Sequence, residues 1–234
     1  MSQGLSFGPA AELYDRIRPT YPPAAMEWVL GTTTQRVVDL GAGTGILTRV
    51  VRGLGHEVWP VEADPAMCAR LAGATPRIAP VVGRAEAIPL STGSVDAVVA
   101  GQAYHWFAPE RAHAEIARIL RPGGMFGPIW NIRDESVPWV AELTRILGSR
   151  PRDDGARVHE LGPAFEPIEC KVFRHAVPMT ADRLVELVAS RSYYLTAPPD
   201  RRVAVETAVR EMATGLPATF PLPYDTVAYR ARRR

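Results

Sequence analysis

Three closely spaced glycines and an acidic residue downstream of them are the part of the chain best suited to bind a ligand. Gly41, Gly43 and Gly45 follow the hydrophobic run of residues 36–40, and a helical pattern begins directly after them. Glycine lets a ligand approach the main chain closely, and the first turn of a helix offers free N–H groups. Glu62 ends the next predicted strand, where a carboxylate can accept hydrogen bonds from both hydroxyls of a ribose. The combination predicts a site for a nucleoside.

The spacing of the glycines discriminates between nucleotide cofactors. The dinucleotide fingerprint is Gly-x-Gly-x-x-Gly, and this chain has Ile46 where that pattern has its third glycine. A cradle for a pyrophosphate is therefore disfavoured. A tight strand-to-helix turn without a ligand is the structural alternative for the glycines. Asp39 has two open interpretations, a carboxylate that fixes the loop and one that reaches a cationic ligand through water.

Residues 37–47 resemble motif I of the class I S-adenosylmethionine-dependent methyltransferases, and Glu62 matches their ribose-binding acid. Residues 83–98 and the Arg-Ile-Leu-Arg-Pro-Gly-Gly run at 118–124 resemble later motifs of the type 11 family, whose members are related to ubiquinone and menaquinone biosynthesis. The resemblance covers residues 7–131 well. It implies S-adenosyl-L-methionine as methyl donor, S-adenosyl-L-homocysteine as product, and a small-molecule acceptor.

The resemblance also assigns cofactor contacts outside the glycine loop. Many relatives carry an Asp at the position of Arg84 to bind the adenine amine, which an arginine cannot do, so the backbone of Ala85 and the side chain of Glu86 are expected there. Tyr14 and Arg18 share one face of an N-terminal helix that resembles a cofactor-covering helix, and Arg18 could pair with the methionine carboxylate. Lid packing and a surface position are the alternatives for these two residues. The expected cofactor residues are Tyr14, Arg18, Asp39, Gly41, Ala42, Gly43, Glu62, Ala85, Glu86, Gln102 and Ala103.

The loop at residues 101–107, Gly-Gln-Ala-Tyr-His-Trp-Phe, is the candidate for catalysis. Ligands of open α/β sheets bind beyond the carboxyl ends of the strands, so this loop should border donor and acceptor. Tyr104 and His105 are candidate catalytic residues, and the ordinary pKa of histidine suits a general base. The alternative is that His105 is hydrogen-bonded within the loop and orients Trp106. The candidates for acceptor binding are Trp106, Tyr193 and Tyr194, with core packing as the alternative for the two tyrosines.

Other histidines and the cysteines carry no predicted site. The remaining histidines are expected on helix ends or surface strands, and their spacing predicts no metal site. These histidines are His56, His113, His159 and His175. Cys68 and Cys170 are isolated, so no disulfide framework is expected.

Short β-branched runs that alternate with helical patterns predict the elements that must position these residues. They indicate an α/β fold, Rossmann-like and doubly wound, with helices on both faces of a mostly parallel seven-stranded sheet whose last strand is antiparallel. One domain is expected over residues 1–234, with a helical cap at 1–35, a cofactor-binding core at 36–131 and a substrate side at 132–234. The predicted strands are 36–40, 57–62, 78–83, 94–100, 125–131, 168–177 and an edge strand at 219–229. The predicted helices are 45–53, 65–72, 109–120, 139–147, 181–192 and 201–212.

The charge balance disfavours nucleic acid as a partner. The chain has 27 basic and 25 acidic residues, and 26 of the basic ones are arginines. Without Arg230, Arg232, Arg233 and Arg234 the balance is 23 against 25, so the body is near neutral and these four are expected to form a frayed, solubilising end. The sequence has no long apolar run and no signal sequence, which predicts a cytoplasmic monomer or homodimer that does not enter membranes. The alternatives to a methyltransferase are a non-catalytic S-adenosylmethionine-binding module and a nicotinamide-dependent oxidoreductase.

Overall fold

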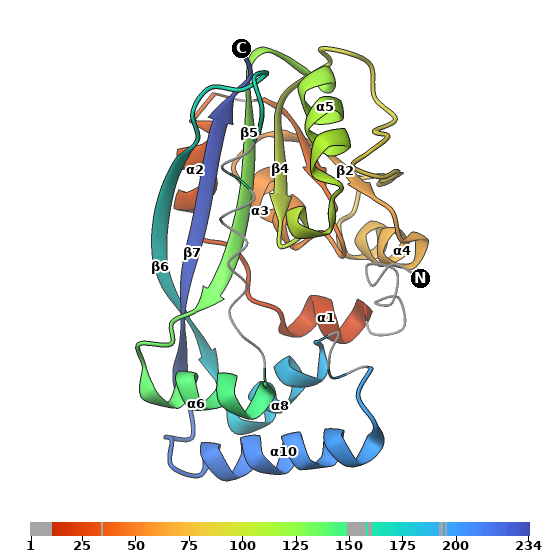
Figure 1. Cartoon of the computed structure of the whole chain (residues 1–234). Coiled ribbons are helices and arrows are strands. Elements are labelled where there is room, and N and C mark those ends of the chain that lie inside the picture. The colour runs from red at the N-terminus through yellow and green to blue at the C-terminus, as the bar shows by residue number, and fades with distance from the viewer. Residues whose placement is uncertain (1–10, 34, 149–157, 159–160, 192–193, 195) are drawn as a thin grey trace. The chain divides into compact units, whose positions relative to one another are not determined.

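The computed structural model describes residues 11–33, 35–148, 158, 161–191, 194 and 196–234. Seven strands form one sheet in the order β3-β2-β1-β4-β5-β7-β6 (Figure 1). The sheet is mostly parallel and its last strands are antiparallel, which confirms the predicted Rossmann-like fold class. The strands are β1 Arg36–Leu40, β2 Glu57–Glu62, β3 Val81–Val82, β4 Val95–Gly101, β5 Leu120–Arg133, β6 Glu169–Met179 and β7 Phe220–Arg232.

Proline at the first turn marks the start of most of the helices. Proline fixes a helical φ and lacks only an N–H that would have no partner there, so it favours this position. Side-chain caps start two helices, α4 in addition to its proline and α8 without one, because Asp64 and Thr180 accept hydrogen bonds from Ala66 N (2.8 Å) and Arg183 N (3.3 Å). The helices are α1 Ala11–Ile17, α2 Pro23–Leu30, α3 Ile46–Gly53, α4 Pro65–Ala74, α5 Pro109–Ile119, α6 Pro138–Leu147, α8 Ala181–Ala189 and α10 Pro199–Ala213, with a 3₁₀ turn, η3, at Tyr104–Trp106.

The chain packs into two compact units. We call the first the glycine-loop unit; it consists of Thr20–Asn131, Asp153–Phe173 and Thr226–Arg234. The second, the helical unit, consists of Met1–Pro19, Ile132–Arg152 and Arg174–Asp225. Strands β5, β6 and β7 each contribute residues to both units. The single domain over residues 1–234 stays a prediction.

Strands buried on both faces form the core of the glycine-loop unit. β1 pairs in parallel with both β2 and β4, with Val37 opposite Val58 on one side and Ala97 on the other. Val37, Val38 and the run Ala97–Ala100 are fully buried. This agrees with the near-continuous hydrophobic runs from which these strands were predicted.

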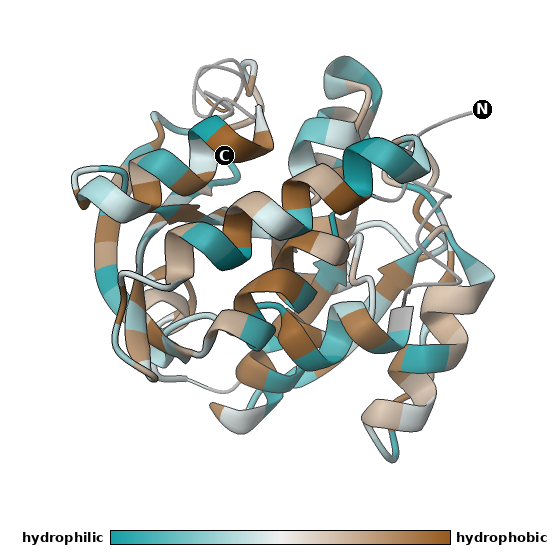
Figure 2. Ribbon diagram, turned by 90° about the horizontal axis from the view of Figure 1, so that it is seen from below, coloured by the Kyte–Doolittle hydropathy of each residue, from teal (hydrophilic) through white to brown (hydrophobic). Residues whose placement is uncertain are grey.

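Amphipathic helices and the first half of β7 form the core of the helical unit. Hydrophobic and hydrophilic residues alternate along the helices (Figure 2). In α8, for example, Leu184, Leu187 and Val188 are buried whereas Asp182 and Arg183 are exposed. The buried residues that pack together with them are Ile17, Val140, Leu143, Leu147, Met179, Val185, Val205, Val209, Phe220, Leu222 and Tyr224.

The prediction that the last strand lies at the edge of the sheet is wrong, because β7 lies between β5 and β6. Its two prolines, Pro221 and Pro223, fall within the first four residues of a 13-residue strand. The later residues therefore keep the N–H groups that a central strand needs. β3 is shorter than predicted, and Pro80 directly before it supplies no N–H to a ladder.

The arginines at the C-terminal end are not frayed, contrary to the prediction, because β7 extends to Arg232 and brings them against the glycine-loop unit. Arg230 lies over the Trp28 ring at 4.3 Å and pairs with Glu169 at 2.8 Å. Arg232 Nη1 donates to the carbonyl of Gly123 at 3.0 Å. These arginines hold the strand in place, a role that charge counting could not assign.

Candidate functional site

The glycine loop between β1 and α3 has a backbone that only glycine adopts readily. Gly41, Gly43 and Gly45 have φ angles of +70°, +57° and +87°. A Cβ atom on Gly41 would lie 2.6 Å from the Cβ of Ala103. The loop that follows β1 is therefore in contact with the loop that follows β4, as the shared carboxyl edge of two parallel strands requires.

Most main-chain N–H groups of this loop are used within the protein. Gly41 N and Ala42 N both donate to the carbonyl of Val61, at 2.8 and 3.1 Å. Gly45 N donates to the carbonyl of Ala42 at 2.9 Å, and Gly43 N donates to Glu62 Oε2 at 2.8 Å. A pyrophosphate needs such groups free. This hydrogen bonding supports the interpretation of the spacing, that the loop approaches a ligand without cradling a pyrophosphate.

Glu62 is fixed by three main-chain donors at the end of β2. Its Oε1 accepts from Ala63 N and Asp64 N at 2.8 and 2.9 Å, and its Oε2 accepts from Gly43 N. A carboxylate offers about four lone-pair positions, so Oε2 retains capacity for a further donor. The side chain is partly exposed, at the mouth of the loop. The glycine loop thus helps to fix the position of Glu62, which is predicted to bind a ribose beside that loop.

Asp39 is a buried carboxylate in which one of the two oxygens has a hydrogen-bond partner among the described residues. Its Oδ2 accepts a hydrogen bond from the hydroxyl of Thr48 at 2.6 Å, which ties the end of β1 to the first turn of α3. Its Oδ1 is buried and has no hydrogen-bond partner among the described residues. Burial raises the pKa of Asp39 to about 7, against the lowering effect of Thr48, and the charge of Glu62 adds to the rise. The contact with Thr48 supports the loop-fixing interpretation, and Oδ1 remains available to a donor.

Gln102 has an unusual backbone for a residue with a side chain. Its φ angle is +55°, a conformation that costs free energy for any residue but glycine. Two bonds hold it there, from its N–H to the carbonyl of Ile129 (3.0 Å) and from Nε2 to the carbonyl of Asn131 (3.2 Å). In the part of the chain that the structure describes, its buried Oε1 has no hydrogen-bond partner. A second unsatisfied acceptor therefore lies in a strained loop, directly before Ala103.

Tyr104 is packed into the core instead of being exposed to ligands. It is 2% exposed, and its hydroxyl lies 2.6 Å from His113 Nε2. The rings of Phe107, Phe126 and Trp130 surround it, with centroids within 5.9 Å. These contacts give Tyr104 the role of holding the η3 turn in place. Its catalytic role stays a prediction.

The structure corrects the expected surface positions of two histidines. His113 is buried on the inner face of α5, and burial lowers its pKa, which favours the neutral ring that bonds Tyr104. His56 is buried too, and its Nδ1 accepts from Gln35 N at 3.2 Å. The spacing of His113 with Ile116, one helical turn on, is the sequence signal that could have placed it inward.

His105 and Trp106 lie side by side at the end of η3, with ring centroids 4.8 Å apart and an interplanar angle of 43°. Trp106 is 39% exposed, whereas most large hydrophobic side chains of the chain are buried. The contact agrees with the alternative in which His105 orients Trp106. The roles of His105 as a base and of Trp106 in acceptor binding stay predictions.

The segment predicted to contact adenine is held against α5. Glu86 Oε1 accepts from Ala108 N at 2.8 Å, so part of its hydrogen-bonding capacity secures the start of α5. Arg84 is exposed and lies 3.8 Å from Glu86 Oε2, while Ala85 is buried. The predicted adenine contacts of Ala85 and Glu86 stay predictions.

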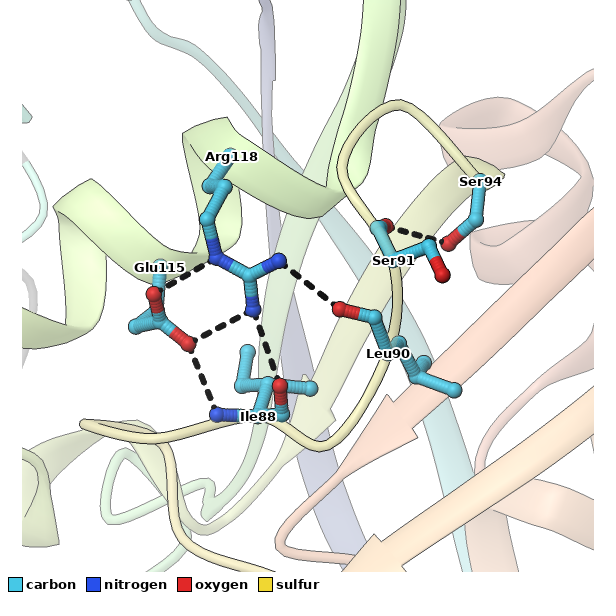
Figure 3. Close-up of polar contacts among 6 residues, drawn as sticks. All are labelled: Ile88, Leu90, Ser91, Ser94, Glu115 and Arg118. Carbon is cyan, nitrogen blue, oxygen red and sulfur yellow. Dashed lines mark hydrogen bonds and ion pairs between the residues drawn. The ribbon is translucent and has the colours of Figure 1, made fainter.

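Arg118 and Glu115 on α5 fix the end of this segment (Figure 3). Arg118 donates to the carbonyls of Ile88 (2.8 Å) and Leu90 (2.7 Å). Glu115 accepts from Ile88 N at 2.8 Å and pairs with Arg118 at 2.7 Å, a contact that lowers its pKa. From the sequence, Arg118 was only part of a motif that resembles the family, and its positioning role became visible in the fold.

The remaining predicted residues belong to the helical unit. The guanidinium carbon of Arg18 lies 4.6 Å above the ring of Tyr14, and Arg18 Nη2 donates to the carbonyl of Ser190 at 3.1 Å. The Tyr194 hydroxyl donates to Glu206, and burial raises the pKa of Tyr194 to about 12, with Glu206 adding to the rise. Tyr193 lies outside the described residues. The structure thus pairs Tyr14 with Arg18, as the shared helix face predicts.

The described part of the chain has neither a metal-binding cluster nor a membrane-spanning helix. It contains no cluster of three or more His, Cys, Asp or Glu side chains that could hold a metal ion. None of its helices combines the length and the apolar composition that crossing a membrane requires.

Comparisons with known proteins give one consistent answer. The family described as "Methyltransferase domain" matches residues 38–127. An uncharacterized methyltransferase of Mycobacterium tuberculosis (strain ATCC 25618 / H37Rv) is 44% identical over 236 residues, which cover 97% of this chain and 95% of the relative. A solved structure from Anaeromyxobacter dehalogenans is named as a candidate type II methyltransferase. It is 25% identical to this chain, with a TM-score of 0.67, and the match covers 92% of this chain and 97% of the chain in that structure. A geranyl diphosphate C-methyltransferase from Streptomyces coelicolor A3(2), solved with S-adenosyl-L-homocysteine, has a TM-score of 0.52 at 17% identity, over 91% of this chain and 78% of its own.

Proposed function

The chain belongs to the type 11 family of class I methyltransferases, and from this we propose that it transfers a methyl group from S-adenosyl-L-methionine to a small-molecule acceptor. The observation that carries the proposal is the pair of unsatisfied buried acceptors beside the glycine loop, Asp39 Oδ1 and Gln102 Oε1. When bound, S-adenosyl-L-methionine supplies a methyl group on a positively charged sulfur. A ligand that also carries an ammonium group fits acceptors of this kind.

Each part of the donor has candidate partners in this chain. We assign the ribose hydroxyls to Glu62, whose Oε2 has capacity left, and the methionine ammonium to Gln102 and Asp39. The backbone of Gly41, Ala42 and Gly43 lines the nucleoside. The adenine contacts are assigned to Ala85 and Glu86, and the methionine carboxylate to Tyr14 and Arg18, with Ala103 beside the methionine part.

Methyl transfer from a sulfonium is an in-line displacement, so the protein must align donor and acceptor and exclude water. Tyr104, locked by His113, fixes the turn that carries His105 and Trp106. We assign Trp106 and the tyrosines Tyr193 and Tyr194 to the acceptor. His105 takes a proton where the acceptor carries one of high pKa; a carboxylate acceptor needs no base.

The comparisons support the donor and leave the acceptor open. The Streptomyces coelicolor relative was solved with S-adenosyl-L-homocysteine, and it shares the fold of this chain. The near-neutral charge of the body favours a small molecule over a nucleic acid. We also propose a cytoplasmic location and a monomer or homodimer.

A thermal-shift experiment tests the donor assignment. S-adenosyl-L-homocysteine at about a hundredfold excess over its dissociation constant should add about 2.7 kcal/mol to the free energy of unfolding and raise Tm. NAD serves as the control, because the loop lacks the dinucleotide spacing. A shift with NAD and none with S-adenosyl-L-homocysteine would overturn the proposal, and binding of the donor without turnover across an acceptor panel would indicate a non-catalytic binding module.

A further inference from the structure

A buried tyrosine hydroxyl in the helical unit has no hydrogen-bond partner among the described residues. Tyr224 on β7 is 1% exposed, and its hydroxyl makes no hydrogen bond with any described residue. A buried polar group left unpaired is destabilising, so such groups usually face a ligand or water. The ring is held by His175, which stacks on it with centroids 5.5 Å apart. Burial lowers the pKa of His175, so this neighbour favours the neutral form.

Three arginines from separate segments, Arg18, Arg133 and Arg191, act electrostatically on this hydroxyl. Asp134 N donates to the carbonyl of Pro223 at 3.1 Å, which sets Arg133 beside Tyr224 on the neighbouring strand. Arg18 Nη2 donates to the carbonyl of Ser190, the residue before Arg191. We call Arg18, Arg133, Arg191 and Tyr224 the arginine cluster.

The electrostatic environment of the hydroxyl is positive. Burial raises the pKa of Tyr224, and the charges that act against this rise are those of Arg191, Arg133 and Arg18. No acidic group appears among the causes. Of the acidic residues close in sequence, Asp225 lies 3.4 Å from Arg174. Glu135 accepts from the Thr144 hydroxyl at 2.7 Å, and Arg133 Nη2 donates to the same hydroxyl at 3.2 Å, so Thr144 bridges Glu135 and Arg133.

Arg191 has unused hydrogen-bonding capacity. Its Nε is buried without a hydrogen-bond partner, and within the described ranges no carboxylate pairs with its guanidinium group. Burying an unpaired charge is costly, and a planar guanidinium fits carboxylate and phosphate oxygens in a two-bond geometry. The guanidinium group of Arg191 therefore offers hydrogen-bond donors to an anion, at a place where no described carboxylate accepts from it.

We propose that the arginine cluster is an anion subsite, and that the methyl acceptor of this enzyme carries a carboxylate or phosphate group that binds there. This inference rests on the proposed function, which it extends by naming the substrate class. Arg133 follows Asn131 by two residues along β5, and Asn131 in turn accepts a hydrogen bond from Gln102, which is assigned to the donor. Strand β5 thus carries residues of both the subsite and the segment that contacts Gln102.

The positive charge of the arginine cluster favours binding of an anionic methyl acceptor over binding of the cationic methyl donor. S-adenosyl-L-methionine has a sulfonium, an ammonium and one carboxylate, so its net charge at neutral pH is positive. Three guanidinium groups around one hydroxyl favour a ligand of net negative charge. Arg18 would then serve the acceptor in place of the methionine carboxylate.

Calorimetric titration of the protein without donor tests the subsite directly. The probes are succinate and inorganic phosphate, with sodium chloride at matched ionic strength as the blank. Arg191→Gln should weaken binding of the preferred anion by about tenfold or more, and Tyr224→Phe by less, as loss of charge-assisted and neutral hydrogen bonds predicts. Arg191→Lys should retain part of the affinity, which guards against a folding defect. Arg210→Gln on α10 is the matched control, because Arg210 is exposed and paired with Asp182 at 2.6 Å.

The outcomes separate the subsite from the donor site. Weaker anion binding in Arg191→Gln, with S-adenosyl-L-homocysteine affinity unchanged within about twofold, supports the proposal, and the tighter of the two probes identifies the anionic group. Absence of anion binding to the wild type, or equal binding by Arg191→Gln, would overturn it. A parallel loss of S-adenosyl-L-homocysteine affinity would overturn it in favour of the methionine carboxylate. If the wild type binds the anion but not S-adenosyl-L-homocysteine, the proposed donor fails and the subsite stands.

Discussion

At the glycine loop, two carbonyl-type oxygens, Asp39 Oδ1 and Gln102 Oε1, are buried without hydrogen-bond partners among the described residues. In the arginine cluster, the corresponding atoms are the Arg191 Nε and the hydroxyl of Tyr224. Acceptors without donors suit a cation, and guanidinium donors without acceptors suit an anion. The difference indicates that the two regions bind ligands of opposite charge, a cationic methyl donor and an anionic acceptor.

The largest effect should come from Asp39→Asn, measured as stability against pH. The carboxyl group has a pKa of about 7 in the folded protein against 3.8 in the unfolded chain. The folded state therefore binds more protons between about pH 4 and pH 7, and the free energy of unfolding falls as the pH rises through this range. At about 1.4 kcal/mol per pKa unit the total is on the order of a few kcal/mol. Denaturant titrations at several pH values should show this slope in the wild type and lose it in Asp39→Asn.

The same variant tests whether the glycine loop favours a cation. A positively charged donor favours the ionised form of Asp39, so S-adenosyl-L-methionine should bind more tightly as the pH rises towards 7, with release of protons. Asp182→Asn is the control, because Asp182 is exposed and pairs with Arg210. Stability curves that stay parallel in wild type and Asp39→Asn would contradict the raised pKa.

Glu62→Ala should weaken S-adenosyl-L-homocysteine binding by about 1.5–3 kcal/mol, the loss expected for a charged hydrogen bond. The substitution also leaves Gly43 N, Ala63 N and Asp64 N without their acceptor, so Tm should fall as well. Titration calorimetry gives the affinity. Glu57→Ala on the same strand is the matched control, because Glu57 is exposed and its side chain accepts a hydrogen bond from the Trp59 indole. Unchanged affinity in Glu62→Ala would remove Glu62 from the ribose site.

These two regions also show what the sequence could and could not predict. The glycine loop and Glu62 lie in consecutive elements, and their function depends on local backbone conformation, so spacing alone was informative. The four members of the arginine cluster lie at residues 18, 133, 191 and 224, and only the tertiary fold brings them together. The local spacing with Tyr14 marked Arg18 alone, and in a chain with 26 arginines nothing local connects it with Arg133 and Arg191.

The strands also differ in how well the sequence alone predicted them. β1 and β2 were predicted with correct ends, because short β-branched runs between glycine and proline signals are local. The place of β7 within the sheet was not predicted, because the order of strands depends on contacts distant in sequence. Tyr104 was assigned to catalysis from its place in a loop, and its burial against His113 from α5 could not be seen.

Tyr104→Phe should destabilise the protein by about 1–2 kcal/mol, because it leaves His113 Nε2 buried without its partner. A double-mutant cycle with His113→Phe should give a coupling energy of about 1 kcal/mol, measured by denaturant unfolding. Turnover should fall through misplacement of His105 and Trp106, with little change in donor affinity. Additive losses would show that the hydroxyl and the ring do not act as a pair.

His105→Ala distinguishes a base from a residue that orients Trp106. A general base contributes on the order of 10²–10⁴ in rate, so such a loss of kcat is expected if the acceptor carries a proton of high pKa. Turnover within about tenfold of the wild type would remove the base. That result would agree with the anion subsite, because a carboxylate acceptor needs no base.

The smallest effect should come from Arg210→Gln, and it sharpens the comparison most directly. This substitution removes the same charge as Arg191→Gln, yet Arg210 forms an exposed ion pair with Asp182, so its loss should cost less than about 1 kcal/mol of stability. Anion affinity should change by less than about twofold, since exposed charges are screened at physiological salt. If both variants weakened succinate and phosphate binding equally, the anion would be attracted by net charge alone. The two regions would then no longer differ in the kind of ligand that they are built to bind.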